Sequence, residues 1–510
     1  MNSAFEQCRK VDAGRACYQN VKDRISRSDK EKVARAKSIT RIVIATLITA
    51  LACISCSSPR DSVGVVFPET ENPTLPDLTA VDEELASYIR TRHEKVEQYP
   101  TSGSERGRLA MTYDVNNWTR QSLPIYEQAQ QLDPHEFMWP YFSAHQHAKL
   151  GEYEHAVAKL EDAISIDPEY TAAWLWLGSW LLRLDQFDEA ETAFERAFSI
   201  DQSFYAIIGK ARVKLRSGNS QEAIDLLEPL RVKTLHPQIF RLLASAYEDL
   251  RRASEAKVAR ALGKQDAALN WPDSIMLRRE KHIRGFGERL SRAQRLIQAN
   301  RLEDSLIELS ALRLKYGERP SLVSTLAWVY SLKRETDLAI ETLQIGIEAD
   351  PNHQPYYTQL GDLVSLTGAL GTAEALLRKS VELNSSDSEA YLRLGIVLMQ
   401  QEQFDDAIDS LKNVLELGSS SNSISEAHLH LGTIEGYRKQ WGKAAEHFKK
   451  TIELNPRHIA AHERLCYVYI ETGQFDELES ALRWANQLAI PPENFDQVIA
   501  YRDEVLAHSE

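Results

Sequence analysis

Apolar side chains recur along most of the chain in blocks whose spacing fits helices rather than strands. In residues 172–202, large and small apolar residues alternate at fixed places: Trp174, Leu177, Gly178, Leu181, Ala190, Phe194 and Ala197. Pro134 and Pro168 lie 34 residues apart, each after an Asp, and Gln202 takes the same place in the next block. Proline cannot continue the hydrogen-bond ladder of a helix, so each Asp-Pro marks a helix end. The pattern predicts a repeated pair of antiparallel helices.

The spacing of these residues resembles the tetratricopeptide repeat, a helix-turn-helix unit of 34 residues. The seven residues of the 172–202 block fall at repeat positions 4, 7, 8, 11, 20, 24 and 27. The resemblance implies an all-α fold, a right-handed α-solenoid in which antiparallel helix pairs stack on their neighbours. We expect the small residues at positions 8 and 20, Gly178 and Ala190, to face each other where the two helices cross.

The same spacing recurs in many other blocks of the chain. Clear copies are expected at residues 137–170, 171–203, 320–353, 354–387, 388–424 and 425–458, and weaker copies at 103–136, 204–236, 237–270 and 459–492. The predicted organisation is a first repeat array (103–270), a degenerate repeat or hinge (271–319), where Trp271-Pro272 breaks the register, and a second array (320–492). Capping helices are expected at residues 81–102 and 493–510.

A different pattern precedes the repeats. Residues 42–55 carry no charged side chain, and we expect residues 42–56 to be a signal, lipoprotein or transmembrane anchor. The length suits the apolar core of a signal sequence better than a spanning helix, which needs about 20 residues. The segment resembles a bacterial lipoprotein signal, with Cys56 or Cys53 as the candidate for lipidation, and an uncleaved single span is the alternative. Pro-punctuated residues 57–80 are expected to form a linker.

Charge divides the chain at the same place. Residues 1–41 carry eleven basic and five acidic side chains, whereas the whole chain has a net charge of −14, so the remainder bears −20. Such a charge argues against nucleic-acid binding. Two alternatives are open for the basic segment: either it stays in the cytoplasm, or translation begins at Val33 rather than Met1 and most of it is not made. Both place the repeats in the periplasm of a bacterial cell envelope.

No motif of a nucleotide-binding site, a hydrolase or a metal centre is found in the sequence. The pairs His145/His147 and His428/His430 are two residues apart, so on a helix the members of each pair point in different directions and cannot share one ion. We therefore expect a protein that is not an enzyme, with no catalytic residue, no cofactor and no metal.

Function is then expected from the concave groove, which in this family is lined by the first helix of each pair. Aromatic residues and Arg carry most of the energy at protein interfaces. The candidates for the groove are Tyr141, Phe142, His145, Trp176, Arg183, Arg212, Arg216, Arg241, Trp328, Arg393, His430, Arg464 and Tyr467. The predicted function is a membrane-anchored protein-interaction scaffold that binds an unidentified partner peptide or helix; the alternative is an assembly factor for an envelope secretion, polysaccharide or respiratory complex.

Overall fold

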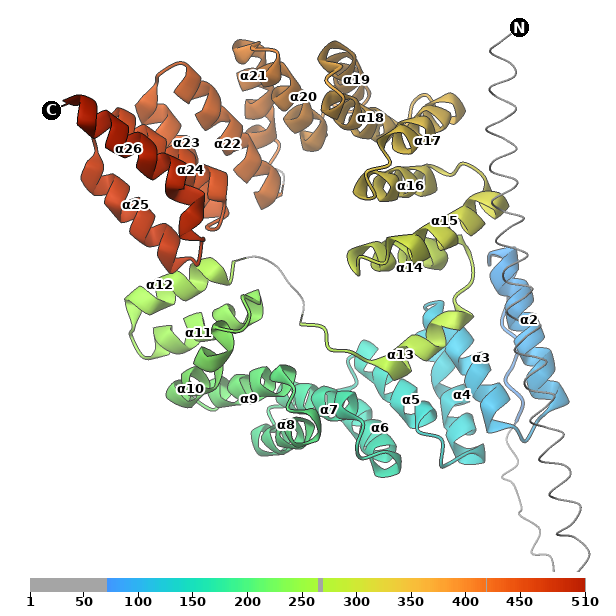
Figure 1. Ribbon diagram of the computed structural model, residues 1–510. Helices are drawn as coiled ribbons and strands as arrows, with labels where there is room; N and C mark the ends of the chain where they lie inside the picture. The colour runs from blue at the N-terminus through green and yellow to red at the C-terminus, as the bar shows by residue number, and fades with distance from the viewer. Residues whose placement is uncertain (1–70, 265–268, 419, 510) are drawn as a thin grey trace, which may run out of the picture. The chain divides into compact units, whose positions relative to one another are not determined.

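The computed structural model describes residues 71–264, 269–418 and 420–509. The basic segment 1–41, the predicted anchor 42–56 and both lipidation candidates, Cys53 and Cys56, lie outside these ranges. The described residues form helices and no strand, which confirms the predicted all-α solenoid (Figure 1). Within the same ranges, no helix is long and apolar enough to cross a membrane.

The first repeat array follows a single helix, α2 (Glu83–Gln98), and consists of five helix pairs. These are α3 (Gly103–Val115) with α4 (Thr119–Leu132), α5 (Met138–Lys149) with α6 (Tyr153–Ile166), α7 (Thr171–Arg183) with α8 (Phe187–Asp201), α9 (Phe204–Arg216) with α10 (Ser220–Arg231), and α11 (Pro237–Asp249) with α12 (Ala253–Leu262). The short helices α13 (Ser274–Arg278) and η1 (Arg279–His282) come next.

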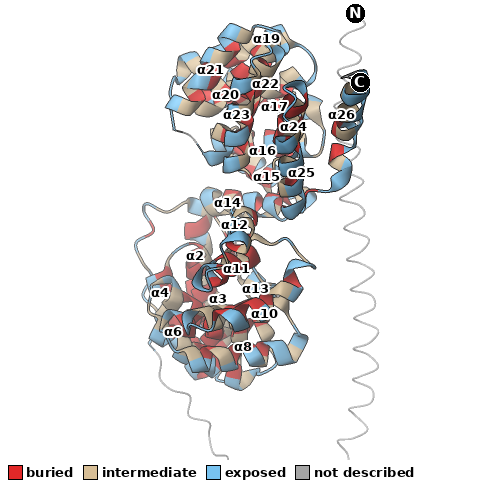
Figure 2. Ribbon diagram, turned by 90° about the vertical axis from the view of Figure 1, so that its left-hand side faces the viewer, coloured by how far each residue is buried: buried red, intermediate tan, exposed pale blue. Residues whose placement is uncertain are grey.

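Six further pairs form the rest of the solenoid. These are α14 (Phe286–Gln298) with α15 (Leu302–Tyr316), α16 (Pro320–Leu332) with α17 (Thr336–Ala349), α18 (Gln354–Leu366) with α19 (Leu370–Leu383), α20 (Ser388–Gln400) with α21 (Phe404–Glu416), α22 (Ser421–Tyr437) with α23 (Trp441–Leu454), and α24 (Ile459–Glu471) with α25 (Phe475–Gln487). The 3-10 helix η2 (Pro492–Phe495) and α26 (Asp496–Ser509) end the chain. In Figure 2, buried residues lie where neighbouring helices meet and exposed ones cover the outer helix surfaces.

The two helices of each pair are joined by a tight turn through a residue in the left-handed region. Gly151, with φ of +82°, takes this place between α5 and α6, because glycine has no Cβ to oppose a positive φ. Asp185, with φ of +58°, takes it between α7 and α8. The turn therefore keeps the same geometry whether or not the sequence supplies glycine.

Small residues let the paired helices approach closely, as the sequence predicted. A Cβ on Gly178 would lie 2.8 Å from the ring of Phe194, at position 24. A Cβ on Gly395 would lie 2.8 Å from Leu411, also at position 24, and 3.4 Å from the backbone oxygen of Ala407, at position 20. Positions 8 and 20 therefore face each other as expected, and the large side chain at position 24 fills the space that glycine leaves.

The first helices of the pairs lie on the inner side of the curved array. Neighbouring first helices touch one another, as α7 touches α9 and α9 touches α11, whereas each second helix contacts mainly the helices before and after it in the chain. A stack whose first helices are closer together than its second helices curves toward the first helices. The inner face is therefore the one on which the sequence places the candidate groove residues.

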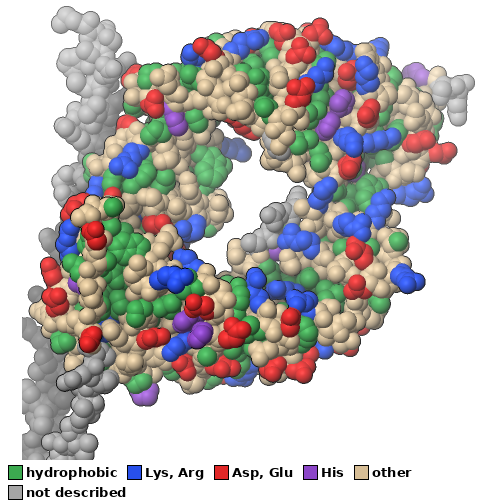
Figure 3. All heavy atoms as spheres, turned by 180° about the vertical axis from the view of Figure 1, so that it is seen from behind, with side chains coloured by type: hydrophobic (Ala, Val, Ile, Leu, Met, Phe, Trp, Pro, Cys, Tyr) green, Lys and Arg blue, Asp and Glu red, His purple; other side chains and the backbone are tan. Residues whose placement is uncertain are grey.

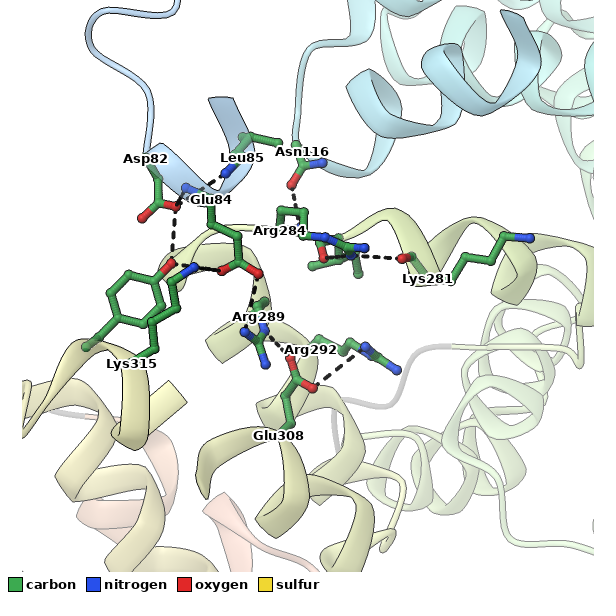
Figure 4. Close-up of polar contacts among 12 residues, drawn as sticks. Asp82, Glu84, Leu85, Asn116, Lys281, Arg284, Arg289, Arg292, Glu308 and Lys315 are labelled. Atoms are coloured by element: carbon green, nitrogen blue, oxygen red, sulfur yellow. Dashed lines mark hydrogen bonds and ion pairs between the residues drawn. The ribbon is translucent and has the colours of Figure 1, made fainter. Parts of the chain in front are cut away.

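Helix α2 packs against the pair α14–α15 through the half-buried carboxylate of Glu84 (Figure 4). Glu84 lies 2.9 Å from Lys315 Nζ and 3.6 Å from Arg289, and accepts a hydrogen bond of 3.0 Å from Tyr316 Oη. Burial opposes the ionised form of Glu84, but the hydrogen bonds from Lys315 and Tyr316 outweigh it and lower the pKa of this carboxyl. Glu308 accepts from the same Arg289 at 2.6 Å, so one guanidinium joins two helices of different parts of the solenoid.

Gly395→Ala tests the close approach of paired helices. The added methyl group meets Leu411 at 2.8 Å, and overpacking of this kind destabilises a core by about 1–3 kcal/mol. We expect a lower apparent melting temperature in far-ultraviolet circular dichroism. The matched control is Gly371→Ala, where nothing lies within 4 Å of the new Cβ and the greater helix propensity of Ala should maintain or raise the melting temperature. Equal melting temperatures for the two variants would contradict this account of the seam.

Candidate functional site

Four of the predicted groove residues lie together on the inner face of the first array. Tyr141, Phe142 and His145 belong to α5, and Trp176 belongs to α7. His145 packs edge-on against Trp176, with ring centroids 4.9 Å apart, and against Trp180 at 5.2 Å. Tyr141 and Phe142 have no exposed surface, and His145 retains 9 %. These side chains are aromatic neighbours as expected, but they are covered.

The cover is a segment of the same chain, residues 271–283, which contains α13 and η1 (Figure 1). Trp271 packs edge-on against Trp176, with ring centroids 4.5 Å apart, and its ring also lies 6.3 Å from that of Tyr205. Ile275 and Met276 pack onto the apolar core of the first array. The part of the chain that breaks the repeat register thus occupies the inner face of the repeats before it.

Asp273 makes the most specific contacts of this segment. Its carboxylate accepts hydrogen bonds from Tyr141 Oη at 2.6 Å, Tyr170 Oη at 2.7 Å and Trp176 Nε1 at 3.2 Å. It also accepts from the backbone N–H of Met276 at 3.0 Å and thereby caps α13. Four donors match the number of lone-pair sites on a carboxylate, so this group is fully paired. We call the three donors Tyr141, Tyr170 and Trp176 the Asp273 socket.

The donors of the socket keep their protons over the whole physiological range. Burial, followed by the negative charge of Asp273, raises the pKa of Tyr141 well above its usual value. Burial likewise raises the pKa of Tyr170 to about 12. Both hydroxyls therefore remain neutral and donate to the carboxylate of Asp273.

The segment continues along the inner face after Asp273. Arg279 donates to Asp114 at 2.6 Å, and the carboxylate of Asp114 is itself 3 % exposed. His282 Nδ1 lies 2.9 Å from Tyr88 Oη, and the Asn116 side chain donates to the carbonyl of His282 at 3.2 Å. Removing one partner of a buried ion pair is strongly destabilising, because the other charge stays buried alone. Both ends of the segment are thus attached to the first array.

Three Arg candidates lie farther along the inner face. Arg183 ends α7 and stands 5.3 Å from the ring centroid of Tyr153, and Arg216 ends α9 and pairs with Asp185. Arg212 is partly buried between them, and no ion pair or hydrogen bond reaches its guanidinium from any described residue. Burial, with the charges of Arg183 and Arg216, lowers the pKa of Arg212. We call these three residues the Arg212 cluster.

The remaining groove candidates are dispersed and mostly satisfied within the chain. The guanidinium of Arg241 donates to Gln238 Oε1 at 2.9 Å. Arg393 pairs with Glu389 at 2.7 Å and with Asp362 at 3.3 Å. The others are Trp328, which is 44 % exposed, His430 beside Glu426, Arg464 bonded to Thr433, and Tyr467 packed on Tyr501. Arg393 and Arg464 lie near enough to His430 that, with burial as the larger cause, their charges help to lower the pKa of His430 to about 4, but no hydrogen bond or ring contact joins these three described residues.

The described residues best able to hold a divalent cation are His147, Glu152 and His155, whose ligand atoms lie within 4.8 Å of one another. His147 Nδ1 is 2.8 Å from Glu152 Oε2, and the rings of His147 and His155 stack with centroids 5.4 Å apart. They meet across the α5–α6 turn. The expectation of no metal site rested on histidines two residues apart on one helix. This turn instead brings His147 close to Glu152 and His155, which lie five and eight positions later in the sequence.

Three residues of the occupied site were not among the sequence candidates: Tyr170, Trp271 and Asp273. Tyr170 stands before α7 and outside the first-helix positions that were used to select groove residues. The signal for the other two was the Trp271-Pro272-Asp273 sequence itself, which interrupts the repeat with a large aromatic residue and a fixed bend. A register break identifies where a segment leaves the stack, but not where it docks.

Acidic and basic side chains are interspersed over the face of the solenoid seen in Figure 3. Many described charges also have close partners of opposite sign, such as Arg196 with Glu169 and Lys210 with Glu195. Exposed pairs of this kind contribute little to stability.

The pH dependence of stability should reveal the buried His145. Burial, followed by the positive charge of Arg279, lowers its pKa to about 3, whereas an unfolded His titrates near 6.5. The stabilising contribution is present above about pH 6.5 and is lost as the pH falls, by up to about 1.4 kcal/mol per unit. His145→Phe should reduce the loss of stability between pH 7 and pH 5, measured by urea unfolding followed through Trp fluorescence.

The control for this measurement is His135→Phe, which changes an exposed histidine of the same array. It should leave the pH dependence of the wild-type chain unchanged. If His145→Phe retains the full acid sensitivity of the wild type, the buried imidazole is not its source.

Comparison with known proteins identifies the repeat. Family models of the tetratricopeptide repeat match residues 147–206 and 365–422. Among curated proteins, anaphase-promoting complex subunit 3 of Schizosaccharomyces pombe is 30 % identical over 123 residues, and the bovine SGT1 homolog is 30 % identical over 89 residues. The match covers 24 % and 18 % of this chain, and only 18 % and 26 % of the two relatives.

The chain is also similar to several solved structures. The chain is similar to the Cut9–Hcn1 tetramer of the anaphase-promoting complex (13 % identity, TM-score 0.41, 84 % of this chain and 98 % of that one) and to MamA (25 % identity, TM-score 0.28, 34 % and 95 %). The two matched segments lie in both repeat arrays, and helix pairs fill the chain between them. The chain thus contains tetratricopeptide repeats in both arrays, which supports a protein-interaction scaffold.

Proposed function

We propose that this scaffold binds an acidic segment of a partner protein at the Arg212 cluster, on the inner face of α7 and α9. We further propose that residues 42–56 hold the chain at a bacterial membrane, with the repeats in the periplasm. The alternative, an assembly factor for an envelope complex, stays a prediction, because no described residue selects one such complex.

The observation that carries the binding proposal is the unpaired charge of Arg212. A guanidinium that is partly removed from water and flanked by two others is disfavoured, as the lowered pKa of Arg212 expresses. Asp185 pairs with Arg216, but no described carboxylate pairs with Arg212. A ligand that brings carboxylates would relieve the repulsion among the three guanidinium groups, and such charge-assisted hydrogen bonds are stronger than neutral ones.

The surroundings favour a polypeptide as the source of those carboxylates. Tyr153 and Phe187 stack on Arg183 and Arg216, with ring centroids 5.3 Å and 5.8 Å from the guanidinium carbons. Aromatic side chains beside Arg provide apolar contact surface next to charge, the combination found in the energetically important parts of protein interfaces. The partner is therefore expected to carry Asp or Glu next to apolar residues in one extended or helical segment.

Arg212→Glu tests this proposal by reversing the central charge. Full-length chain immobilised on a resin should recover at least one envelope protein, which the Arg212→Glu variant loses, and the recovery should fall as salt concentration rises. Lys233→Glu provides the matched control, because it makes the same change of charge at an exposed residue after α10. Identical recovery by the wild type and both variants would show that the Arg212 cluster is not the binding surface.

Membrane attachment is tested separately by fractionation of bacterial cells. Full-length chain should sediment with the membranes, and a chain without residues 42–56 should not, because the only long uncharged segment of the N-terminal region has been removed. Replacement of both Cys53 and Cys56 by Ser distinguishes the two anchors: a lipid anchor is lost, whereas a spanning helix remains. Membrane association of the chain without residues 42–56 would contradict the proposed anchor.

A further inference from the structure

The Asp273 socket has the features of a ligand-binding site that the chain fills with its own segment. Its three donors come from α5, from the residue before α7 and from α7 itself, and they converge on one carboxylate. None of these donors belongs to the 271–283 segment. The acceptor and its receptor are thus contributed by parts of the chain more than 95 residues apart in sequence.

We propose that the Asp273 socket recognises peptides in which Trp stands two residues before Asp, and that residues 271–283 occupy it as a tethered internal ligand that such a peptide displaces. The proposal goes beyond the proposed function, since it concerns α5 and α7 rather than the Arg212 cluster. Both share the premise that the inner face of the first array binds polypeptide.

The aromatic part of the motif is read by surfaces on two helices. Trp271 packs edge-on against Trp176 of α7 and lies beside Tyr205 of α9, so the indole rests between two rings of the repeat array. Edge-to-face aromatic pairs are stabilising beyond the burial of their area. Pro272, between Trp271 and Asp273, is exposed, which leaves the middle position of the motif free of contact and open to other residues.

The acidic part of the motif is read by hydrogen bonds. Tyr141 and Tyr170 each place a hydroxyl within 2.7 Å of Asp273, and the indole N–H of Trp176 completes the set. Hydrogen bonds to a charged group are stronger than neutral ones, and a buried donor left without a partner is destabilising. An amide in place of the carboxylate would offer only one acceptor atom to three donors, so the socket discriminates Asp from Asn.

The small number of anchoring contacts in residues 271–283 favours displacement over permanent attachment. Its helix α13 has five residues, none of them buried, and Leu277 within it is 58 % exposed. The anchoring is concentrated at Trp271 and Asp273 and, farther on, at Arg279 and His282. A tethered ligand acts at an effective concentration of the order of mM, so a free peptide with the same two anchors must bind more tightly or act when those anchors are weakened.

The test uses a dye-labelled synthetic peptide of residues 269–284 and the full-length chain, with binding followed by fluorescence anisotropy. The double variant Trp271→Ala/Asp273→Asn empties the socket and should bind the peptide saturably, at least about tenfold more tightly than the wild type, whose own segment competes. A peptide carrying Asn in place of Asp273 should bind the double variant about tenfold more weakly, since one charge-assisted hydrogen bond corresponds to about that factor.

Two further variants keep the outcome clear. Leu277→Ala alters an exposed residue of the same segment and should behave as the wild type. Asp273→Asn alone is the milder change if the double variant loses helicity, and it should accelerate amide hydrogen exchange in α13 and permit weaker peptide binding. No binding of the peptide to either folded variant, or equal binding to the wild type and the double variant, would overturn the proposal and make the segment a structural strut.

The result is independent of the fate of the Arg212 cluster. Arg212→Glu, combined with the double variant, should leave peptide affinity within about twofold, because no hydrogen bond or ion pair joins Arg212 to any described residue of the socket or the segment. A chain that binds the peptide but recovers no acidic partner retains this inference and loses the proposed function. A chain that recovers the acidic partner but does not bind the peptide retains the proposed function and loses this inference.

Discussion

A helix pair of this length cannot bury its apolar face alone, so every pair in the chain depends on contact with its neighbours. The contact within a pair is close because glycine or alanine at the crossing admits a large side chain from the opposite helix, as Gly178 admits Phe194. The contact between pairs is closer among first helices than among second helices, and this difference curves the stack. The inner face exists because of that curvature.

Because the stack curves, the charged and aromatic side chains on the first helices converge. Their polar groups therefore lose contact with water and need hydrogen-bond or ion-pair partners. The first array meets this need in two different ways. At α5 and α7 the chain supplies its own partner, Asp273, to three donors, whereas at α7 and α9 the guanidinium of Arg212 has no partner among the described residues. Among the described residues of the inner face, the donors around Asp273 are therefore paired, whereas the guanidinium of Arg212 is not.

The segment that contains Asp273 also links the first array to the α14–α15 pair. Residues 271–283 continue directly into α14, and the carboxylate of Glu84 on α2 is bonded to Arg289 and Lys315 of the α14–α15 pair. Asn116 accepts from the backbone N–H of Arg284 at 3.1 Å, close to the same junction (Figure 4). Displacement of the segment would thus alter the contacts between the first array and the α14–α15 pair. Peptide binding would then affect how these repeats are arranged.

The sequence alone determined the repeat, the helix pairs and the inner-face positions, because a 34-residue pattern of large and small side chains reports packing within a pair and between adjacent pairs. It also singled out Tyr141, Trp176 and Arg212 as groove residues. Only the tertiary structure showed that Trp271 and Asp273 cover the first two, and that the third has no hydrogen-bond or ion-pair partner among the described residues. Docking of residues 271–283 onto helices a hundred residues earlier is a non-local contact, and periodicity carries no information about contacts between segments outside the repeat.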